Sequence, residues 1–241
     1  MSDPRPDLGG SWVQAMAELR EKRKDAEPLE VHKLATATRR LISLMSSKRI
    51  PPELAAEVCT LIEGAYSSLE PLETLSHFSG FAESANSGDT TTFFDRSPIQ
   101  GSANPLAPPL VIDHYSDQDG KVTITASATF SAAYEGPPGC VHGGYIAAVF
   151  DEVLGSAQSL SGNPGMTANL SINYRRPTPL FEEITYEAEL VSVVGRKIMT
   201  AGRSFFDGKV TAEATGLFIS VDFEKLAQLA VEKLSRTENP N

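Results

Sequence analysis

The sequence predicts an α+β protein in which one buried helix packs against a long antiparallel sheet, with a helical extension at the N-terminus. Three observations lead to this fold class. Residues 1–75 place apolar side chains at helical spacing, residues 76–109 are rich in Ser, Gly, Thr, Asn and Pro, and residues 110–222 change to a period of two around one strongly apolar helix. We expect an extension, an irregular connector and the main domain, followed by a short helix or tail at 223–241.

The extension contains three candidate helices. Pro51 and Pro52 suit the start of the clearest one, because proline is tolerated in the first helical turn, and apolar residues then recur as far as Leu69. Earlier segments at Leu34–Met45 and Trp12–Lys24 also have helical character. We interpret the extension as a helical hairpin that caps the main domain or extends an oligomer contact. A partner-binding or membrane-surface role is the alternative, although no strongly basic amphipathic face is visible.

Extended segments and one helix follow the connector, whose run GSANPLAPP at 101–109 does not fit regular structure. Asp119-Gly120 between two alternating segments predicts a hairpin turn, and the ligands of a calcium loop are missing around it. The segments after the helix are joined by short connections, which require antiparallel neighbours. The expected strands are Val111–Tyr115, Val122–Phe130, Thr167–Tyr174, Glu182–Val194, Lys197–Phe206 and Lys209–Asp222.

The helix expected from about 143 to 159 is apolar nearly all round, which is typical of a buried helix. Asp151 lies off its main apolar stripe, beside small residues that leave room for another group to approach the carboxylate. Burying a charge without partners is costly, so Asp151 and Glu152 either mark a solvent-facing edge or serve a chemical purpose. The main stripe consists of Ile146, Val149, Phe150, Val153 and Ala157.

The start of this helix favours the chemical interpretation. Gly143 and Gly144 are expected to leave backbone N–H groups uncovered by side chains, at the positive end of the helix dipole. Such amides can hold the oxygen of a tetrahedral intermediate while a carboxylate activates water or attacks the carbonyl. Gly144 and Asp151 are about 10 Å apart along one helix, too far to act on one carbonyl. We therefore expect a homodimer with shared active sites, and pairing of two dimers into a tetramer stays open.

Two runs of the sequence, PPGCVHGGYIAAVFDEVLG (Pro137–Gly155) and MTANLSINYRRPTPL (Met166–Leu180), resemble the hotdog-fold acyl-CoA thioesterases. The likeness is greatest to the PaaI-like branch and the thioesterase-superfamily-member enzymes, and it covers about 110–222. Its specificity lies in the combination of His-Gly-Gly, an Asp nine residues after the His, and a Thr sixteen residues after that Asp. The resemblance implies a hotdog fold, in which the sheet wraps around the central helix, and hydrolysis of an acyl-CoA thioester to a carboxylic (fatty) acid and coenzyme A.

The resemblance also implies a role for each matched residue. Asp151 matches the catalytic carboxylate, and Gly143 and Gly144 match the glycines whose amides polarise the thioester carbonyl. His142 matches the motif histidine, which shapes the loop, and Thr167 matches the hydroxyl that positions the water or the carboxylate. The positions that match coenzyme A contacts are Asn173, Arg175, Arg196 and Lys197.

One departure from the family pattern lies just before the histidine. Many PaaI-like relatives carry Asn or Gln a few residues upstream of it, whereas this chain has Gly136, Pro137 and Pro138. Some superfamily-member relatives share this Pro-Pro-Gly form. The resemblance therefore supplies no side chain here that would position a water molecule.

The strand after the helix alternates regularly between apolar and polar residues. Its even-numbered residues, from Ala168 to Tyr174, are expected to face the helix, and its odd-numbered residues, including Thr167, to form a polar row. Arg175-Arg176 and Arg196-Lys197 place four cations in two short segments of a chain whose net charge is −10. Arginine suits the phosphates of coenzyme A, whereas plain strand alternation and chance clustering on the surface are the simpler alternatives.

Composition argues against several other classes of protein. The net charge of −10 disfavours nucleic-acid binding, and no apolar run is long enough to span a membrane. The N-terminus lacks the profile of a secretory signal, so we expect a cytoplasmic protein. No metal site or separate cofactor is expected, because the histidines are scattered and coenzyme A is part of the substrate. The remaining alternatives are a non-catalytic acyl-CoA-binding or scaffold protein and a hotdog hydratase or dehydratase. The sequence does not show which acyl chain the substrate carries.

Overall fold

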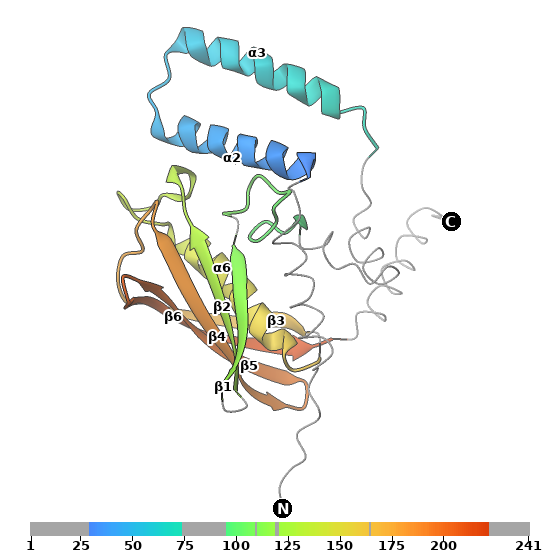
Figure 1. Ribbon diagram of the computed structural model, residues 1–241, viewed down its shortest axis with the longest axis vertical. Helices are drawn as coiled ribbons and strands as arrows, with labels where there is room; N and C mark the ends of the chain where they lie inside the picture. Colours follow the sequence, from blue (N-terminus) through green and yellow to red (C-terminus); the bar gives the residue numbers. More distant parts are fainter. Residues whose placement is uncertain (1–28, 74–94, 109, 119–120, 164, 222–241) are drawn as a thin grey trace, which may run out of the picture.

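The structure is a computed structural model that describes residues 29–73, 95–108, 110–118, 121–163 and 165–221 (Figure 1). Some predictions fall outside these residues and are not tested by it. They are the helix at Trp12–Lys24, the first part of the connector, the turn residues Asp119 and Gly120, and the tail at 223–241.

Six strands form one antiparallel sheet in the order β1-β2-β4-β5-β6-β3, so β1 and β3 are its edges. The sequence-based strand predictions are confirmed, with ends that differ by a few residues. Asp207 and Gly208 both have positive φ, at 50° and 68°, as a two-residue hairpin turn between β5 and β6 requires. The strands are β1 (Val111–Gln118), β2 (Lys121–Thr129), β3 (Gly165–Tyr174), β4 (Glu183–Val194), β5 (Lys197–Phe206) and β6 (Lys209–Ser220).

One α-helix, α6 (Gly143–Ser159), packs against one face of this sheet (Figure 1). The five residues of its predicted apolar stripe are all buried, and Leu154 is buried with them. Leu154 lies close to the strands: a Cβ at Gly202 would come within 3.2 Å of its Cδ2, and one at Gly216 within 3.4 Å of its Cδ1. Small residues in β5 and β6 therefore let the helix approach the sheet. This α+β arrangement confirms the predicted hotdog fold.

The N-terminal extension forms two helices, α2 (Glu30–Ser47) and α3 (Pro52–Leu69), which lie beyond one end of the sheet domain (Figure 1). α2 packs near the short 3-10 helix η1 (Ala132–Tyr134) and buries Ala35. Its Arg39 donates a hydrogen bond of 2.8 Å to the carbonyl oxygen of Asn104 in the connector. No residue of α3 is buried. No helix in the described part of the chain is long and apolar enough to cross a membrane.

The described part of the connector, 95–108, forms turns that contribute to the core. Ile99 and Ala107 are buried, and Leu110 follows them into the same core at the start of the main domain. His32 of α2 contacts Asp95 at 3.1 Å, which ties the first helix to the connector. The connector therefore links α2 to the sheet domain through side chains as well as through the backbone.

Candidate active site

The Pro-Pro-Gly segment before α6 is a tight turn. The N–H of Cys140 donates to the carbonyl oxygen of Pro137 at 2.9 Å, and Gly139 between them has a φ of 72°. Pro before a residue with positive φ is the pattern of a type II turn, in which glycine is favoured at the third position. The N–H of Gly139 also donates to the Glu135 carboxylate at 2.7 Å. The departure at 136–138 is thus a structured turn that leads the chain into the histidine.

His142 caps the helix rather than facing an open pocket. Its Nδ1 accepts a hydrogen bond of 3.0 Å from the N–H of Gly144, and its own N–H donates to the carbonyl oxygen of Tyr134 at 2.8 Å. A Cβ at Gly136 would lie 2.7 Å from the Cα of His142, so only glycine fits beside it. The prediction that both glycine amides are uncovered is therefore wrong for Gly144, because the histidine ring occupies its N–H.

The backbone amide of Gly143 is the one at the helix start that His142 does not cap. Within the described residues its N–H donates no hydrogen bond, as expected for the first residue of a helix. Its carbonyl oxygen accepts a hydrogen bond of 2.8 Å from the hydroxyl of Tyr174, which reaches across from the end of β3. The sequence analysis placed Tyr174 only as an apolar residue facing the helix. The structure adds a specific contact that holds the turn carrying the free amide.

Two tyrosine rings pack against each other at the start of the same helix. The ring of Tyr134 meets Tyr145, in the first turn of α6, edge-on with centroids 4.8 Å apart. The Tyr134 hydroxyl donates to the carbonyl oxygen of Leu106 at 3.1 Å. Burial, together with Tyr145, raises the pKa of Tyr134 to about 12, although nearby Arg39 lowers it. Tyr134 therefore stays protonated and acts as a structural donor between the connector and the helix start.

Asp151, half-buried in the middle of α6, has a defined partner. The hydroxyl of Thr167 in β3 donates a hydrogen bond of 2.8 Å to its Oδ1. Hydrogen bonds to a carboxylate are shorter and stronger than those between neutral groups, so this contact fixes the orientation of the side chain. Its second carboxylate oxygen, Oδ2, accepts no side-chain hydrogen bond from the described residues. The sequence-predicted pair Asp151 and Thr167 is thus brought together.

Thr167 reaches Asp151 because β3 contains a bulge. The register with β6 shifts between Thr167, opposite Phe218, and Asn169, opposite Leu217, so Ala168 is an extra residue. Phe218 is buried, which places Thr167 on the helix side of the sheet. The prediction that Thr167 shares a polar row with the other odd-numbered residues of this strand is therefore wrong. Beyond the bulge, Leu170 and Ile172 pack against the core as expected.

Glu152, next to the candidate catalytic residue, does not point freely into solvent. Its Oε1 accepts a hydrogen bond from the side-chain amide of Gln100 in the connector. Burial raises the pKa of Glu152, the Gln100 hydrogen bond lowers it, and the charge of Asp151 raises it further. The sequence analysis missed this contact, because no local pattern connects residues 52 positions apart.

The four predicted coenzyme A contacts lie at two ends of β3. Asn173 and Arg175 are at its C-terminal end, whereas Arg196 donates to the carbonyl oxygen of Ser220, which pairs with Gly165 at the other end. About ten residues of strand, roughly 30 Å, separate these ends. Lys197 is exposed beside Arg196. One chain therefore does not gather these cations at a single place.

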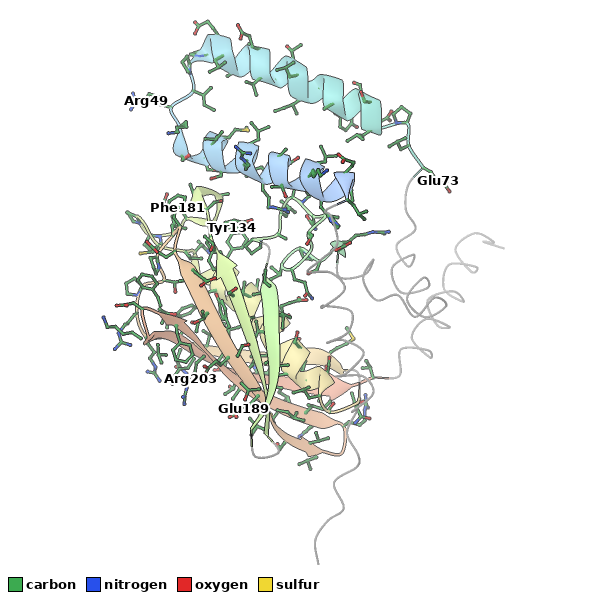
Figure 2. All side chains as sticks on the ribbon, viewed as in Figure 1. Arg49, Glu73, Tyr134, Phe181, Glu189 and Arg203 are labelled. Carbon is green, nitrogen blue, oxygen red and sulfur yellow. The ribbon has the colours of Figure 1, made fainter. Side chains whose placement is uncertain are left out.

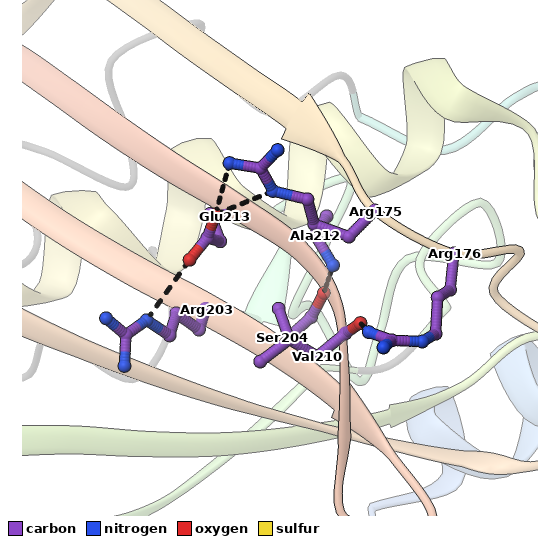
Figure 3. A network of polar contacts seen from close by, with 7 residues as sticks. All are labelled: Arg175, Arg176, Arg203, Ser204, Val210, Ala212 and Glu213. Atoms are coloured by element: carbon purple, nitrogen blue, oxygen red, sulfur yellow. Dashed lines mark hydrogen bonds and ion pairs between the residues drawn. The ribbon is translucent and has the colours of Figure 1, made fainter.

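Arg175 already has a partner on the outer face of the sheet. Its Nε and Nη2 both contact Oε2 of Glu213 at 2.7 Å, and Arg203 lies 3.5 Å from the other oxygen (Figure 3). Arg176 donates to the carbonyl oxygen of Val210 at 2.7 Å (Figure 3). Asn173 lines an open depression of about 580 Å³ on this face, together with Glu187, Glu189, Arg203 and Glu213 among others. The acidic lining makes this depression a poor site for phosphate groups.

The described residues contain no group of three or more His, Cys, Asp or Glu side chains that could hold a metal ion. The candidate site contains a carboxylate, a hydroxyl and a backbone amide that donates no hydrogen bond within the described residues. These groups can act on an electrophilic carbonyl, since they provide a base or nucleophile and an oxyanion donor.

Comparison with known proteins shows the family to which the chain belongs. A family model described as the thioesterase superfamily matches residues 138–214, which include α6 and β3. A crystal structure of a thioesterase superfamily protein is 37% identical, covers 78% of this chain and 94% of its own, and superposes with a TM-score of 0.63. The chain belongs to the thioesterase superfamily. The match covers 78% of this chain, which is more than the length of its main domain. The similarity of this superfamily member to the crystal structure therefore includes residues outside the sheet domain.

Curated relatives of this thioesterase superfamily member match over shorter stretches. Acyl-coenzyme A thioesterase THEM4 of Bos taurus is 42% identical over 93 residues, which are 38% of each chain. Acyl-coenzyme A thioesterase THEM5 of Homo sapiens is 26% identical over 149 residues, which are 61% of this chain and 58% of the relative. The chain thus spans less than two thirds of the length of these relatives.

Proposed function

We propose that this protein hydrolyses acyl-coenzyme A thioesters to a carboxylic acid and coenzyme A, with Asp151 as the catalytic carboxylate. The observation that carries the proposal is the 2.8 Å hydrogen bond from Thr167, which orients a half-buried carboxylate in a largely apolar helix. The names of the THEM4 and THEM5 relatives support the same substrate class.

In the proposed reaction, the amide of Gly143 donates to the thioester carbonyl oxygen as negative charge develops on it. Asp151 either removes a proton from an attacking water or attacks the carbonyl carbon itself to form a mixed anhydride that water then hydrolyses. In both routes the carbon–sulfur bond breaks and coenzyme A leaves as a thiol after taking up a proton. Thr167 holds the carboxylate in position throughout.

The geometry favours a site shared between two chains. Gly143 and Asp151 are eight residues apart, about 12 Å along one helix, so they cannot both contact one carbonyl. β3 is an unpaired edge of the sheet, and edges of this kind are ready to pair with another chain. Antiparallel pairing of two β3 strands about a twofold axis aligns two α6 helices in opposite directions. Gly143 of one chain then approaches Asp151 of the other.

The same pairing accounts for the separated cations. Along two antiparallel β3 strands, the end that carries Arg175 in one chain lies beside the end that carries Arg196 and Lys197 in the other. A coenzyme A molecule at such a position would meet Arg196 and Lys197 of one subunit, and Arg175 of the other if its guanidinium exchanged Glu213 for a phosphate. Cytoplasmic localisation and a further pairing of dimers also remain proposals from the sequence.

The test compares two matched Asp→Asn changes in the full chain. Asp151→Asn is expected to lower kcat by about 10²–10⁴-fold, because it removes the base or nucleophile while preserving shape. Asp207→Asn, in the exposed β5–β6 turn, should leave kcat unchanged, since Asn tolerates positive φ. Release of free thiol is measured with short, medium, long and aromatic acyl-CoAs. Full activity of Asp151→Asn on the best substrate would end the proposal.

A second variant isolates the amide of Gly143. Proline lacks an N–H and is well tolerated at the first position of a helix, and His142 before it has the extended φ and ψ of −62° and 133° that a following proline favours. Gly143→Pro should therefore lower kcat by about 10²–10³-fold, whereas Gly143→Ala, which keeps the N–H, should have a much smaller effect.

Mixing the two inactive variants tests the shared site. If Asp151 and Gly143 of one site come from different chains, half of the randomly reassembled dimers contain one intact site. Subunits of Asp151→Asn and Gly143→Pro co-expressed in equal amounts should then recover roughly a quarter of wild-type activity. A site contained within one chain would recover none.

The alternative functions predict different products in the same assay. A non-catalytic acyl-CoA-binding protein would bind acyl-CoAs without releasing thiol from any of them. A hydratase or dehydratase would change the acyl chain of an enoyl-CoA or hydroxyacyl-CoA and leave the thioester intact.

A further inference from the structure

The N-terminal helices carry an unusual share of the exposed apolar surface. Twelve of the twenty-one exposed large hydrophobic side chains in the described residues lie in 29–72. On α3, Leu61 is 74% exposed and Tyr66 is 63% exposed, and none of its residues is buried. Monomeric proteins rarely expose so much apolar surface, and where they do the surface is usually an interaction site.

α2 and α3 do not cover each other: a short loop joins them and they run in opposite directions, but they do not pack closely together (Figure 1). Leu34 and Leu44 of α2 are 53% and 52% exposed. The opposite side of α2, with Ala35 and Arg39, packs on the connector. The hairpin, residues 30–69, therefore presents apolar side chains from both helices to whatever docks on it.

The charges of the two helices have opposite signs. α3 contains three glutamates, Glu53, Glu57 and Glu63, and no lysine or arginine. α2 contains Lys33, Arg39 and Arg40 but also Glu30, which pairs with Lys33, so its net charge is +2, and the loop after it adds Lys48 and Arg49. Figure 2 shows Arg49 in this loop and Glu73 beyond the far end of α3. Within 29–73, no ion pair joins α2 to α3.

We infer that the partner of this hairpin is the hairpin of a second copy of the chain. Isologous docking about a twofold axis places α3 of each copy against α2 of the other, so both contacts join an acidic helix to a basic one. Contact between the two α3 helices would instead oppose glutamates. Four helices of this length with apolar stripes facing inward form a four-helix bundle, which buries the exposed leucines of both copies.

Two other occupants fit the charges less well. A lipid surface binds amphipathic helices through a basic polar face, and α3 has only acidic charges. A different protein would have to present one acidic and one basic helix of its own to match α2 and α3. A second copy of this chain already has both. The hairpin also attaches near η1 and the connector rather than at the β3 edge, so its docking adds to any pairing through β3.

The experiment reverses charge on one helix at a time in the full chain. One variant carries Glu57→Lys and Glu63→Lys on α3, and the other carries Lys33→Glu and Arg40→Glu on α2. A control, Glu182→Lys with Glu183→Lys, makes the same change in net charge as the first variant at exposed positions of the sheet domain. The molar mass of each is measured by light scattering at equal concentration and low salt, and circular dichroism checks the helix content.

Each hairpin variant alone is expected to have half the molar mass of the wild type, because both of its contacts now oppose like charges. The control should keep the wild-type mass. An equal mixture of the two hairpin variants should recover it, since the reversed α3 of one matches the reversed α2 of the other. Wild-type mass in either single variant would overturn the inference.

Recovery in the mixture is the decisive result, because only contact between copies predicts it. If both variants lose mass and the mixture does not recover, the hairpin contacts a surface of the second copy other than its α2–α3 complement, and the inference is wrong. The measurement does not use thioester hydrolysis, so its outcome is independent of the proposed function.

Discussion

Replacing Thr167 with valine tests whether the hydrogen bond to Asp151 serves catalysis. Valine has nearly the same shape as threonine and the same preference for strands, but it cannot donate the 2.8 Å hydrogen bond. A hydrogen bond to a charged group contributes about 1.5–3 kcal/mol. Because Asp151 is only half-buried and Thr167 is exposed in the single chain, the lower end of this range, about 1.5–2 kcal/mol, applies.

At about 1.36 kcal/mol per tenfold change in rate, the loss corresponds to a fall in kcat of roughly 10–30-fold. KM should change little, because Thr167 acts on the carboxylate rather than on the acyl-CoA. Thr167→Ser, which keeps a hydroxyl, should retain most of the activity. Thr215→Val, at an exposed position of β6, is the matched control and should leave kcat unchanged.

The assay is steady-state release of free thiol from the best acyl-CoA, combined with thermal unfolding of each variant. If Thr167→Val keeps wild-type kcat while Asp151→Asn is inactive, the hydrogen bond has no catalytic role. If Thr167→Ser is as impaired as Thr167→Val, packing rather than the hydroxyl explains the effect.

Two further predictions concern the surroundings of the site. Tyr174→Phe removes the hydrogen bond to the Gly143 carbonyl, worth about 0.5–1.5 kcal/mol, and should lower kcat by up to roughly tenfold; an unchanged kcat would show that the turn is held without it. Burial raises the pKa of Glu152 above its usual 4.5, so the folded state holds this proton more tightly than the unfolded state. Its contribution to stability is therefore complete below about pH 4.5 and declines as the pH rises through the folded-state pKa. Urea unfolding across pH 4–8 should show a smaller decline for Glu152→Gln, which still accepts a hydrogen bond from Gln100; equal declines in both proteins would contradict this assignment.

Much of the main domain follows from local patterns. The boundaries of α6 agree with the prediction because the glycines, the apolar stripe and the end of that stripe are all local signals. The strands were found for the same reason, since alternation and turn residues mark them directly. The resemblance implied that Thr167 positions either the water or the carboxylate, and in the structure its hydroxyl bonds to the Asp151 carboxylate.

Other features depend on residues far apart in the sequence. The bulge at Ala168 reverses which face Thr167 occupies, and nothing in an alternating strand shows where an extra residue will fit against its neighbour. The cap from His142 to Gly144 involves near neighbours, but His142 is also held by the hydrogen bond from its N–H to Tyr134 and by its close packing on Gly136. The partners of Arg175 and Glu152 come from β6 and the connector, which only folding brings close.

By itself, the sequence determined the fold class and the position of the central helix, because periodicity is a property of the chain, and its resemblance to a known family predicted the residues of the candidate site. Tertiary structure decided which amide stays free, which face Thr167 occupies and how the cations are distributed. These depend on strand register and on hydrogen bonds between distant segments, and such contacts leave no periodic trace in the sequence.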